Sequence, residues 1–255
     1  MKIQAILFLA ATCLVSNASA QLTLTGTSYA ESFDSVGTQI PTGWSVTTSA
    51  TASTLGTAAT FDTTVLAWSS TSTGGFRNIA SANIAFTSNT SSQSGDTNRA
   101  LGWRPTSPAE RNGAVTLQLT NTTGFQNFSL SFDLFTANDV SGAQTYVVEY
   151  RVGNTGSFTQ IGSTYTTPTT GASTFNSVSY SFISTDLAAI NDQNSAVFLR
   201  IRGTASSGSG NLDTIGLDNF SLSYSAVPEP STYAALAGLA ALGLVAYRRK
   251  TRLGR

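Results

Sequence analysis

The sequence predicts an all-β protein, an antiparallel two-sheet sandwich for which a jelly roll is the preferred topology. Apolar and polar residues alternate in about ten short segments, which is the pattern of half-buried strands. Gly, Asn and Ser turns separate these segments, and no long stretch between residues 21 and 226 has helical periodicity. The 14 Phe and 8 Tyr in a Ser-, Thr- and Gly-rich chain distinguish it from a hydroxyl-rich disordered stalk.

The clearest strand covers residues 128–134, where four large apolar side chains alternate with polar ones. Polar residues with few apolar anchors predict loops over 48–64 and 88–98, and a single helical turn is expected over 185–190. The full set of expected strands is 22–33, 44–47, 65–69, 76–80, 98–104, 115–119, 128–134, 146–152, 158–161, 178–182, 197–201 and 220–224.

The first twenty residues have the features of a cleaved secretory signal peptide. Lys2 precedes an apolar run from Ile3 to Val15, and the small residues at 18–20 form a cleavage site between Ala20 and Gln21. Cys13, the only cysteine of the chain, lies inside this segment. We therefore expect an exported domain over residues 21–226 that contains neither a disulfide nor a thiolate metal site.

The C-terminal segment, residues 227–255, combines three features. Pro228 and Pro230 fix φ and push the residues before them into the extended region, so the segment begins as a stiff acidic rod. The residues from Tyr233 to Tyr247 are all Ala, Gly, Leu, Val or Tyr, and as a helix they span about 22 Å, short of the roughly 30 Å hydrocarbon core. We expect a thin transmembrane helix over 232–247, with the basic residues of 248–255 on the cytoplasmic side.

This segment resembles the PEP-CTERM sorting signal of exopolysaccharide-producing Gram-negative bacteria. The matching residues are the Val227-Pro228-Glu229-Pro230-Ser231 motif, the short helix with Gly238 and Gly243, and the membrane stop Arg248-Arg249-Lys250. The resemblance implies recognition and cleavage by an exosortase, a membrane transpeptidase-like partner, during passage through the inner membrane. It implies delivery to the cell envelope or extracellular matrix. The alternative is an ordinary single-pass anchor behind a proline linker.

Composition restricts the chemistry of the exported part. Residues 21–226 contain seven Arg, no Lys and twelve carboxylates, a net charge of −5 that argues against nucleic acid as a partner. The chain contains no His, which removes the commonest general base, the catalytic triads and histidine-ligated zinc. Carboxylate pairs, tyrosine and oxygen-ligated metals are the remaining catalytic options.

A structural calcium ion is the one cofactor that the sequence suggests. Glu31 on the first strand and Asp218 on the last face each other if the terminal strands pair, and carboxylates and carbonyls are the oxygen ligands that calcium prefers. The alternative is that Asp218 and Asn219 mark a β-bulge, since the apolar alternation shifts across them. We assign no catalytic residue.

Two further sets of residues offer carbohydrate chemistry. Asp133 and Glu149, expected on neighbouring strands, form the best carboxylate pair for glycoside hydrolysis, which needs a separation of roughly 5 to 10 Å. The alternative is that both face outward and pair with arginines. Three tryptophans offer rings for stacking on sugars, although such residues are more often buried: Trp44, Trp68 and Trp103.

The exported domain also resembles a jelly-roll module common among secreted bacterial proteins, similar to carbohydrate-binding and lectin-type sandwiches. The resemblance implies glycan binding or a spacing role, and it transfers no catalytic residue. We expect a noncatalytic structural or glycan-binding protein, with extracellular polysaccharide as a partner. A carboxylate-dependent carbohydrate-active enzyme and an adhesin or appendage subunit are the alternatives. The matching segments are 31–34, 41–44, 98–102, 120–124 and 215–220.

Overall fold

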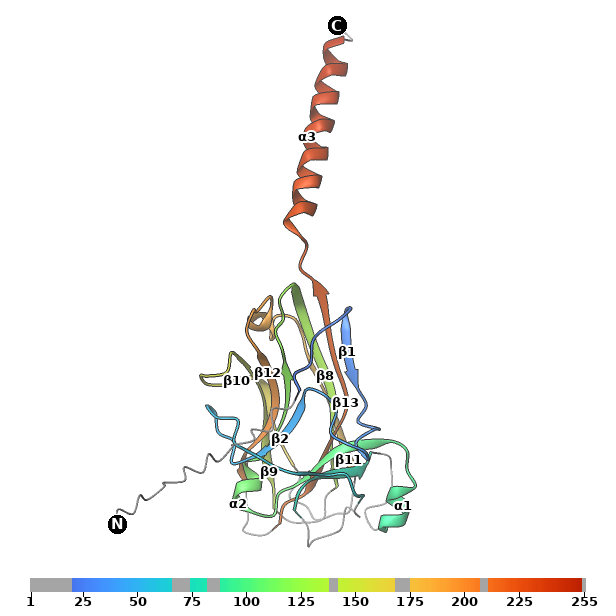
Figure 1. Ribbon diagram of the computed structural model, residues 1–255, viewed down its shortest axis with the longest axis vertical. Helices are drawn as coiled ribbons and strands as arrows, with labels where there is room; N and C mark the ends of the chain where they lie inside the picture. Colours follow the sequence, from blue (N-terminus) through green and yellow to red (C-terminus); the bar gives the residue numbers. More distant parts are fainter. Residues whose placement is uncertain are drawn as a thin grey trace, which may run out of the picture.

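The computed structural model describes residues 20–65, 74–81, 88–137, 142–167, 175–206 and 211–253, and it shows a sandwich of two β-sheets followed by one long helix (Figure 1). The expected all-β sandwich is therefore confirmed. Residues 1–19 of the expected signal peptide, most of the expected strand 65–69, and Trp68 lie outside the described residues.

The first sheet has seven strands in the order β11-β8-β13-β6-β5-β4, with β1 paired to β13 outside this path. Among the described residues its strand pairs are antiparallel except the short β4–β5 pair, which is parallel. Its strands are β1 (Ser28–Glu31), β4 (Phe61–Asp62), β5 (Gly75–Ala80), β6 (Arg99–Arg104), β8 (Phe125–Ala137), β11 (Phe175–Phe182) and β13 (Thr214–Ala226).

The second sheet has six strands in the order β10-β9-β12-β7-β2-β3, all antiparallel. Its strands are β2 (Trp44–Thr48), β3 (Thr57–Ala58), β7 (Ala114–Leu119), β9 (Gln144–Val152), β10 (Thr159–Thr166) and β12 (Val197–Ser206). The short strands β3 and β4 lie in the stretch 48–64 that was expected to be loop. They are two residues long and exist through pairing with β2 and β5, which local alternation does not reveal.

Three short helical turns lie among the strands. Helix α1 (Thr90–Ser94) lies within the expected loop 88–98, and η1 (Ala188–Ile190) lies within the predicted turn 185–190. Helix α2 (Pro108–Arg111) begins with a capping box, in which the Ser107 hydroxyl accepts from the backbone N–H of Glu110 and the Glu110 carboxylate accepts from that of Ser107. This cap holds α2 against the second sheet near β12.

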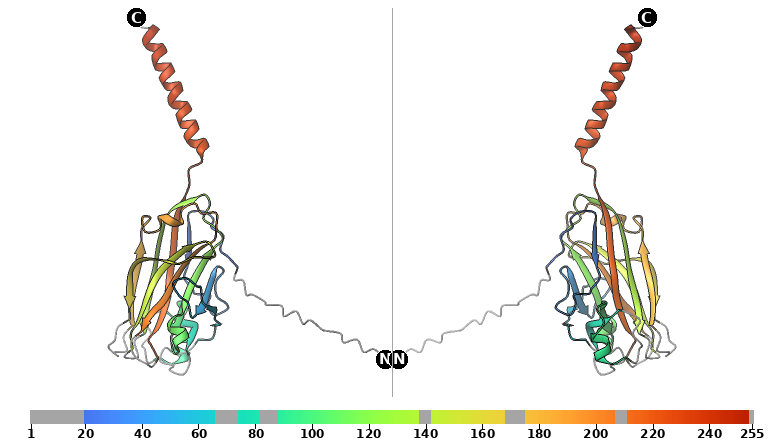
Figure 2. Two further views of the ribbon diagram at one scale, coloured as in Figure 1. Left: turned by 90° about the vertical axis from the view of Figure 1, so that its left-hand side faces the viewer. Right: turned by 90° about the vertical axis from the view of Figure 1, so that its right-hand side faces the viewer.

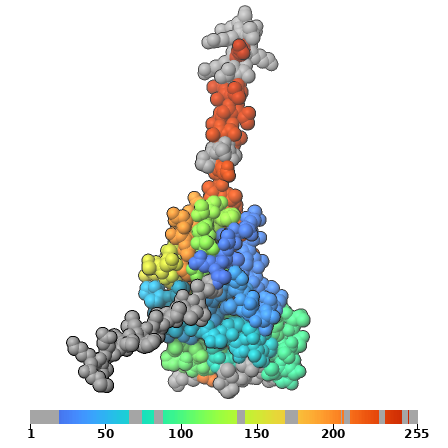
Figure 3. Space-filling view, viewed as in Figure 1, coloured from blue at the N-terminus to red at the C-terminus, as the bar shows by residue number. Residues whose placement is uncertain are grey.

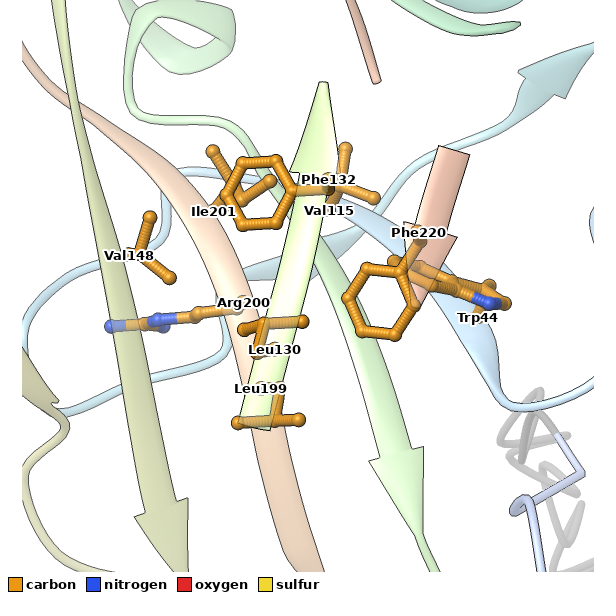
Figure 4. A pocket seen from close by; sticks show the side chains of 9 residues that line it. All are labelled: Trp44, Val115, Leu130, Phe132, Val148, Leu199, Arg200, Ile201 and Phe220. Atoms are coloured by element: carbon orange, nitrogen blue, oxygen red, sulfur yellow. The ribbon is translucent and has the colours of Figure 1, made fainter. Parts of the chain in front are cut away.

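The core lies between the sheets and is filled by the inward positions of the alternating strands. Phe132 of β8 stacks near Phe220 of β13, and Trp44 of β2 meets Phe220 edge to face with ring centroids 4.8 Å apart. A cavity of about 10 Å³ remains among these rings, with side chains from both sheets pointing into it (Figure 4). Its size and apolar lining mark it as a packing defect of the core.

A β-bulge interrupts β13. The register with β8 shifts between Asp218 and Ser221, and Asn219 has a φ of 51°. The bulge moves the inward positions from Ile215 and Leu217 to Phe220 and Leu222, as the alternative interpretation of this sequence predicted.

Candidate functional site

The C-terminal segment continues directly from the last strand. The Val227 backbone N–H donates to the Gly124 carbonyl at 2.8 Å, and Pro228 and Glu229 are exposed. Helix α3 (Pro230–Leu253) then begins at Pro230, two residues before the expected position. Proline is favoured in the first turn because its missing N–H is not needed there and its φ is already helical. The first part of the motif therefore lies between β13 and α3 with Pro228 and Glu229 accessible, and its second part opens the helix.

Helix α3 extends away from the sandwich in all views (Figures 1, 2 and 3). It continues past residue 247 and includes Arg248, Arg249 and Lys250. Four of its leucines are more than half exposed: Leu236, Leu239, Leu242 and Leu244. Within the part of the chain that the structure describes, no helix combines the length and apolar character needed to cross a membrane.

The other end of the exported domain is tied to the sandwich from its first described residues. The Ala20 carbonyl accepts from the Gly43 backbone N–H at 2.9 Å, and Leu22 forms a bridge with Leu119. Gln21, the expected first residue after cleavage, lies exposed between these contacts.

Asp133 and Glu149 do not form a catalytic pair. Asp133 lies on β8 of the first sheet, where it accepts from the Ser179 hydroxyl and the Asn219 amide. Glu149 lies on β9 of the second sheet. In each strand the flanking residues belong to the core, so the two carboxylates face opposite outer surfaces of the sandwich. The alternative interpretation, outward charges paired with arginines, holds for Glu149.

Glu149 belongs to an ionic group that we call the arginine cluster: Glu149, Arg151, Arg200 and Arg202. Its Oε2 accepts from Nε of Arg200 at 2.7 Å and from Nε of Arg202 at 3.1 Å, and its Oε1 accepts from Nη2 of Arg202 at 2.8 Å. Glu149 is 4% exposed and Arg200 is 2% exposed. The strands β9 and β12 place them together because Arg200 is directly opposite Glu149 in the ladder.

The segment 49–58, which follows β2 and includes β3, covers this cluster. The Arg200 guanidinium donates to the carbonyls of Thr51 at 2.6 Å and Thr54 at 2.8 Å, and it lies 3.3 Å from the ring centroid of Phe158. The Phe158 backbone N–H in turn donates to the Ala52 carbonyl. Burial lowers the pKa of Arg200 to about 10, partly offset by Glu149. The cluster thus fastens a polar loop to the outside of the second sheet.

Arg151 adds a third buried cation to the cluster. Its guanidinium lies over the rings of Phe158 and Phe198, at 4.4 and 4.6 Å from their centroids, and its Nε donates to the Gly153 carbonyl. Burial lowers the pKa of Arg151. Aromatic faces and a carbonyl are thus the contacts of Arg151, and they offer it only partial negative charge.

Beside the cluster lies an open groove with a volume of about 590 Å³. One wall is formed by the segment 49–52 and the other by α2, which hydrogen bond to each other through the Ser49 N–H and the Ala109 carbonyl at 2.9 Å. The outer face of β12 contributes Arg202 and Thr204. The complete lining is Ser49, Ala50, Thr51, Ala52, Pro108, Ala109, Asn112, Arg202 and Thr204.

The two residues of the calcium hypothesis lie on paired strands but have separate partners. As expected, β1 pairs with β13, and Glu31 is opposite Phe220. Glu31 accepts from the Phe33 backbone N–H at 2.8 Å, whereas Asp218 accepts from the Ser81 hydroxyl and the Asn219 backbone N–H. Among the described residues there is no group of three or more His, Cys, Asp or Glu side chains suited to a metal. Calcium binding stays a prediction.

The described tryptophans belong to the core. Trp44 is 2% exposed and its indole N–H donates to the Tyr29 hydroxyl at 2.8 Å. Trp103 is 1% exposed and donates to the Glu110 carbonyl at 3.1 Å. Neither ring is available to stack on a sugar.

One segment of the chain matches a family of known proteins, and several solved structures show a low similarity to the chain. Residues 226–250 match the PEP-CTERM protein-sorting motif. The chain resembles a xylan-binding domain from Paenibacillus barcinonensis, with a TM-score of 0.41 and 15% identity over 78% of this chain and 95% of that one. It resembles a cleaved adhesin domain of Lys-gingipain from Porphyromonas gingivalis, with a TM-score of 0.40 and 13% identity over 80% of this chain and 100% of that one.

A carbohydrate-binding module specific for non-crystalline cellulose is similar at a TM-score of 0.39 and 14% identity, over 64% of this chain and 97% of that one. No protein among the curated sequences is significantly similar to the chain. The protein is thus a β-sandwich that carries a PEP-CTERM protein-sorting motif at residues 226–250.

Proposed function

We propose that this chain is an exported, noncatalytic protein of the cell envelope or extracellular matrix, sorted through its C-terminal PEP-CTERM segment. The observation that carries the proposal is the match of residues 226–250 to the sorting motif. Its accessible position supports the same conclusion, since Pro228 and Glu229 are exposed between β13 and α3. An extended, proline-stiffened backbone fits a peptidase cleft without first unwinding.

The partner in sorting is an exosortase-type membrane enzyme. In this proposal the signal peptide 1–20 directs export, residues 232–247 span the inner membrane transiently, and residues 248–255 stay in the cytoplasm until the tail is cut. The basic residues Arg248, Arg249 and Lys250 favour this orientation because positive charge is retained on the cytoplasmic side.

The sandwich itself acts as a glycan-binding or structural module. The separation of Asp133 and Glu149 onto opposite faces supports a noncatalytic role, since hydrolysis of a glycosidic bond needs two carboxylates on either side of one sugar. The groove beside Arg202 has a volume of about 590 Å³ and carries hydroxyl and amide groups among its lining residues, which supports ligand binding.

The test compares the mass of the exported protein in cells with and without the sorting enzyme. We expect an N-terminus at Gln21 in both strains and a shortened C-terminus only where the enzyme is present. Pro228→Ala and Pro230→Ala should each impair the shortening, whereas the control Thr251→Ala, just beyond the matched motif, should not. A protein that retains Met1 would refute export, and one that ends at Arg255 in both strains would refute processing.

A further inference from the structure

The groove beside the arginine cluster has an unbalanced charge. Among the described residues that line it, Arg202 is a guanidinium and none is a carboxylate. Arg200 and Arg151 belong to the same cluster: Glu149 is the carboxylate that contacts Arg200 and Arg202, whereas Arg151 lies over the ring of Phe158. The cluster therefore has a net charge of +2 beneath a domain surface that is acidic overall.

Glu149 does not bind all three nitrogens of the Arg202 guanidinium. Its Nε and Nη2 both donate to Glu149, whereas the bond of its Nη1 to the Gly203 carbonyl is long, at 3.4 Å. The guanidinium fork is fixed in place by the first two bonds, so its third nitrogen is preorganised to donate to an incoming acceptor. Because Arg202 is 9% exposed, this contact would form in a largely desolvated position.

The walls of the groove fit a hydroxyl-rich molecule. They carry hydroxyl groups on Ser49, Thr51 and Thr204 and an amide on Asn112. Such groups accept and donate hydrogen bonds to sugar hydroxyls, and the volume lies within the range of about 300–1,000 Å³ that small-ligand sites occupy. A neutral glycan would satisfy the walls but would leave the cationic floor uncompensated.

We propose that this groove binds a carboxylate-bearing sugar residue of an acidic polysaccharide, with Arg202 as the anion-binding residue. The proposal rests on the glycan-binding role proposed above and names the substrate class. A bound carboxylate supplies the second negative charge that the cluster lacks, and a charge-assisted hydrogen bond in a desolvated site is stronger than one between neutral groups.

The experiment measures the affinity of the exported protein for three probes: polygalacturonate, its fully methyl-esterified form and dextran sulfate. We expect binding to polygalacturonate that weakens at least tenfold on esterification, since the ester removes the charge and keeps the backbone. Dextran sulfate, which offers sulfate esters on a different backbone, should bind more weakly than polygalacturonate. The affinity for polygalacturonate should decrease as the salt concentration rises.

Two variants test the site. Arg202→Gln should weaken binding of polygalacturonate at least tenfold, but it also disturbs Glu149. Ala109→Asp places a carboxylate on the exposed wall of the groove without touching the cluster, and it should produce a similar loss. The matched control is Ala189→Asp, at an exposed position of η1 outside the groove, which should bind as the unaltered protein does.

The outcomes separate this inference from the function on which it rests. Equal affinity for the acid and its ester, or unaltered binding by Ala109→Asp, would overturn the acidic-sugar site and leave glycan binding in place. Stronger binding of dextran sulfate than of polygalacturonate would overturn the carboxylate assignment. Absence of binding to all three probes and to a neutral glycan array would overturn the inference together with the glycan-binding role.

Discussion

Replacing Glu149 by Gln should be among the most destabilising single changes in the domain. The carboxylate accepts three charge-assisted hydrogen bonds of 2.7, 2.8 and 3.1 Å from Arg200 and Arg202. The amide of Gln carries no charge and accepts through one oxygen only, so the buried guanidinium groups of Arg200 and Arg202 lose the anion that they contact. Removal of one partner from a buried ion pair costs about 3–5 kcal/mol. For a domain of this size each kcal/mol lowers Tm by about 2–4 °C, which predicts a decrease on the order of 10 °C.

Urea and thermal unfolding of the exported protein measure this effect. The matched control is Asp133→Asn, which removes a carboxylate from the outer face of the other sheet, where its partners Ser179 and Asn219 are uncharged. We expect the control to lose about 1 kcal/mol or less. In Glu149→Gln the segment 49–58 should also exchange its amide hydrogens faster, because Arg200 holds the carbonyls of Thr51 and Thr54. A variant that unfolds within 1 kcal/mol of the unaltered protein would refute the proposed role of the cluster.

Two further predictions concern the first sheet. Burial raises the pKa of Asp218 above its ordinary value of 3.8, so its contribution to stability is present below that value and is lost as the pH rises through the raised pKa. The stability of the unaltered protein relative to Asp218→Asn should therefore fall with increasing pH over this window, and a relative stability that increased instead would contradict the assignment. Gly216→Ala should lower the free energy of unfolding by about 1–3 kcal/mol, because the added methyl overlaps the ring of Phe135. The control Gly95→Ala should be nearly neutral, because its methyl meets only ordinary contacts. Equal unfolding midpoints for the two variants would rule out the overlap.

The strands were predictable because their periodicity is a local property of the sequence. Residues 128–134 lie inside β8 and residues 146–152 lie inside β9, as their alternation indicated. The two-residue strands β3 and β4 were missed because their extended pairing depends on partners distant in the chain. The shift of register at Asp218 was visible in the sequence, since a bulge reverses the order of inward and outward positions.

Strand order was not predictable in the same way, and this decided the candidate site. Asp133 and Glu149 lie on consecutive strands, which suggested neighbours, but the chain crosses from one sheet to the other between β8 and β9. Arg200 and Arg202 were recognisable as outward positions of an alternating strand, yet nothing local showed that Glu149 would be opposite Arg200. The burial of Trp44 and Trp103 likewise follows from packing between sheets and not from residue type.

The position of the tail has a mechanical consequence. The sorting segment leaves the domain along β13, which is an interior strand bonded to β8, β6 and β1 (Figure 1). A force on the tail acts along β13, so the hydrogen bonds of β13 to its neighbouring strands are loaded together in shear. They do not break one after another, as the hydrogen bonds of an edge strand do when it is peeled away. A domain tethered through β13 therefore resists extraction by force better than one tethered through its edge strand β11, and the groove lies on the other sheet, away from this load.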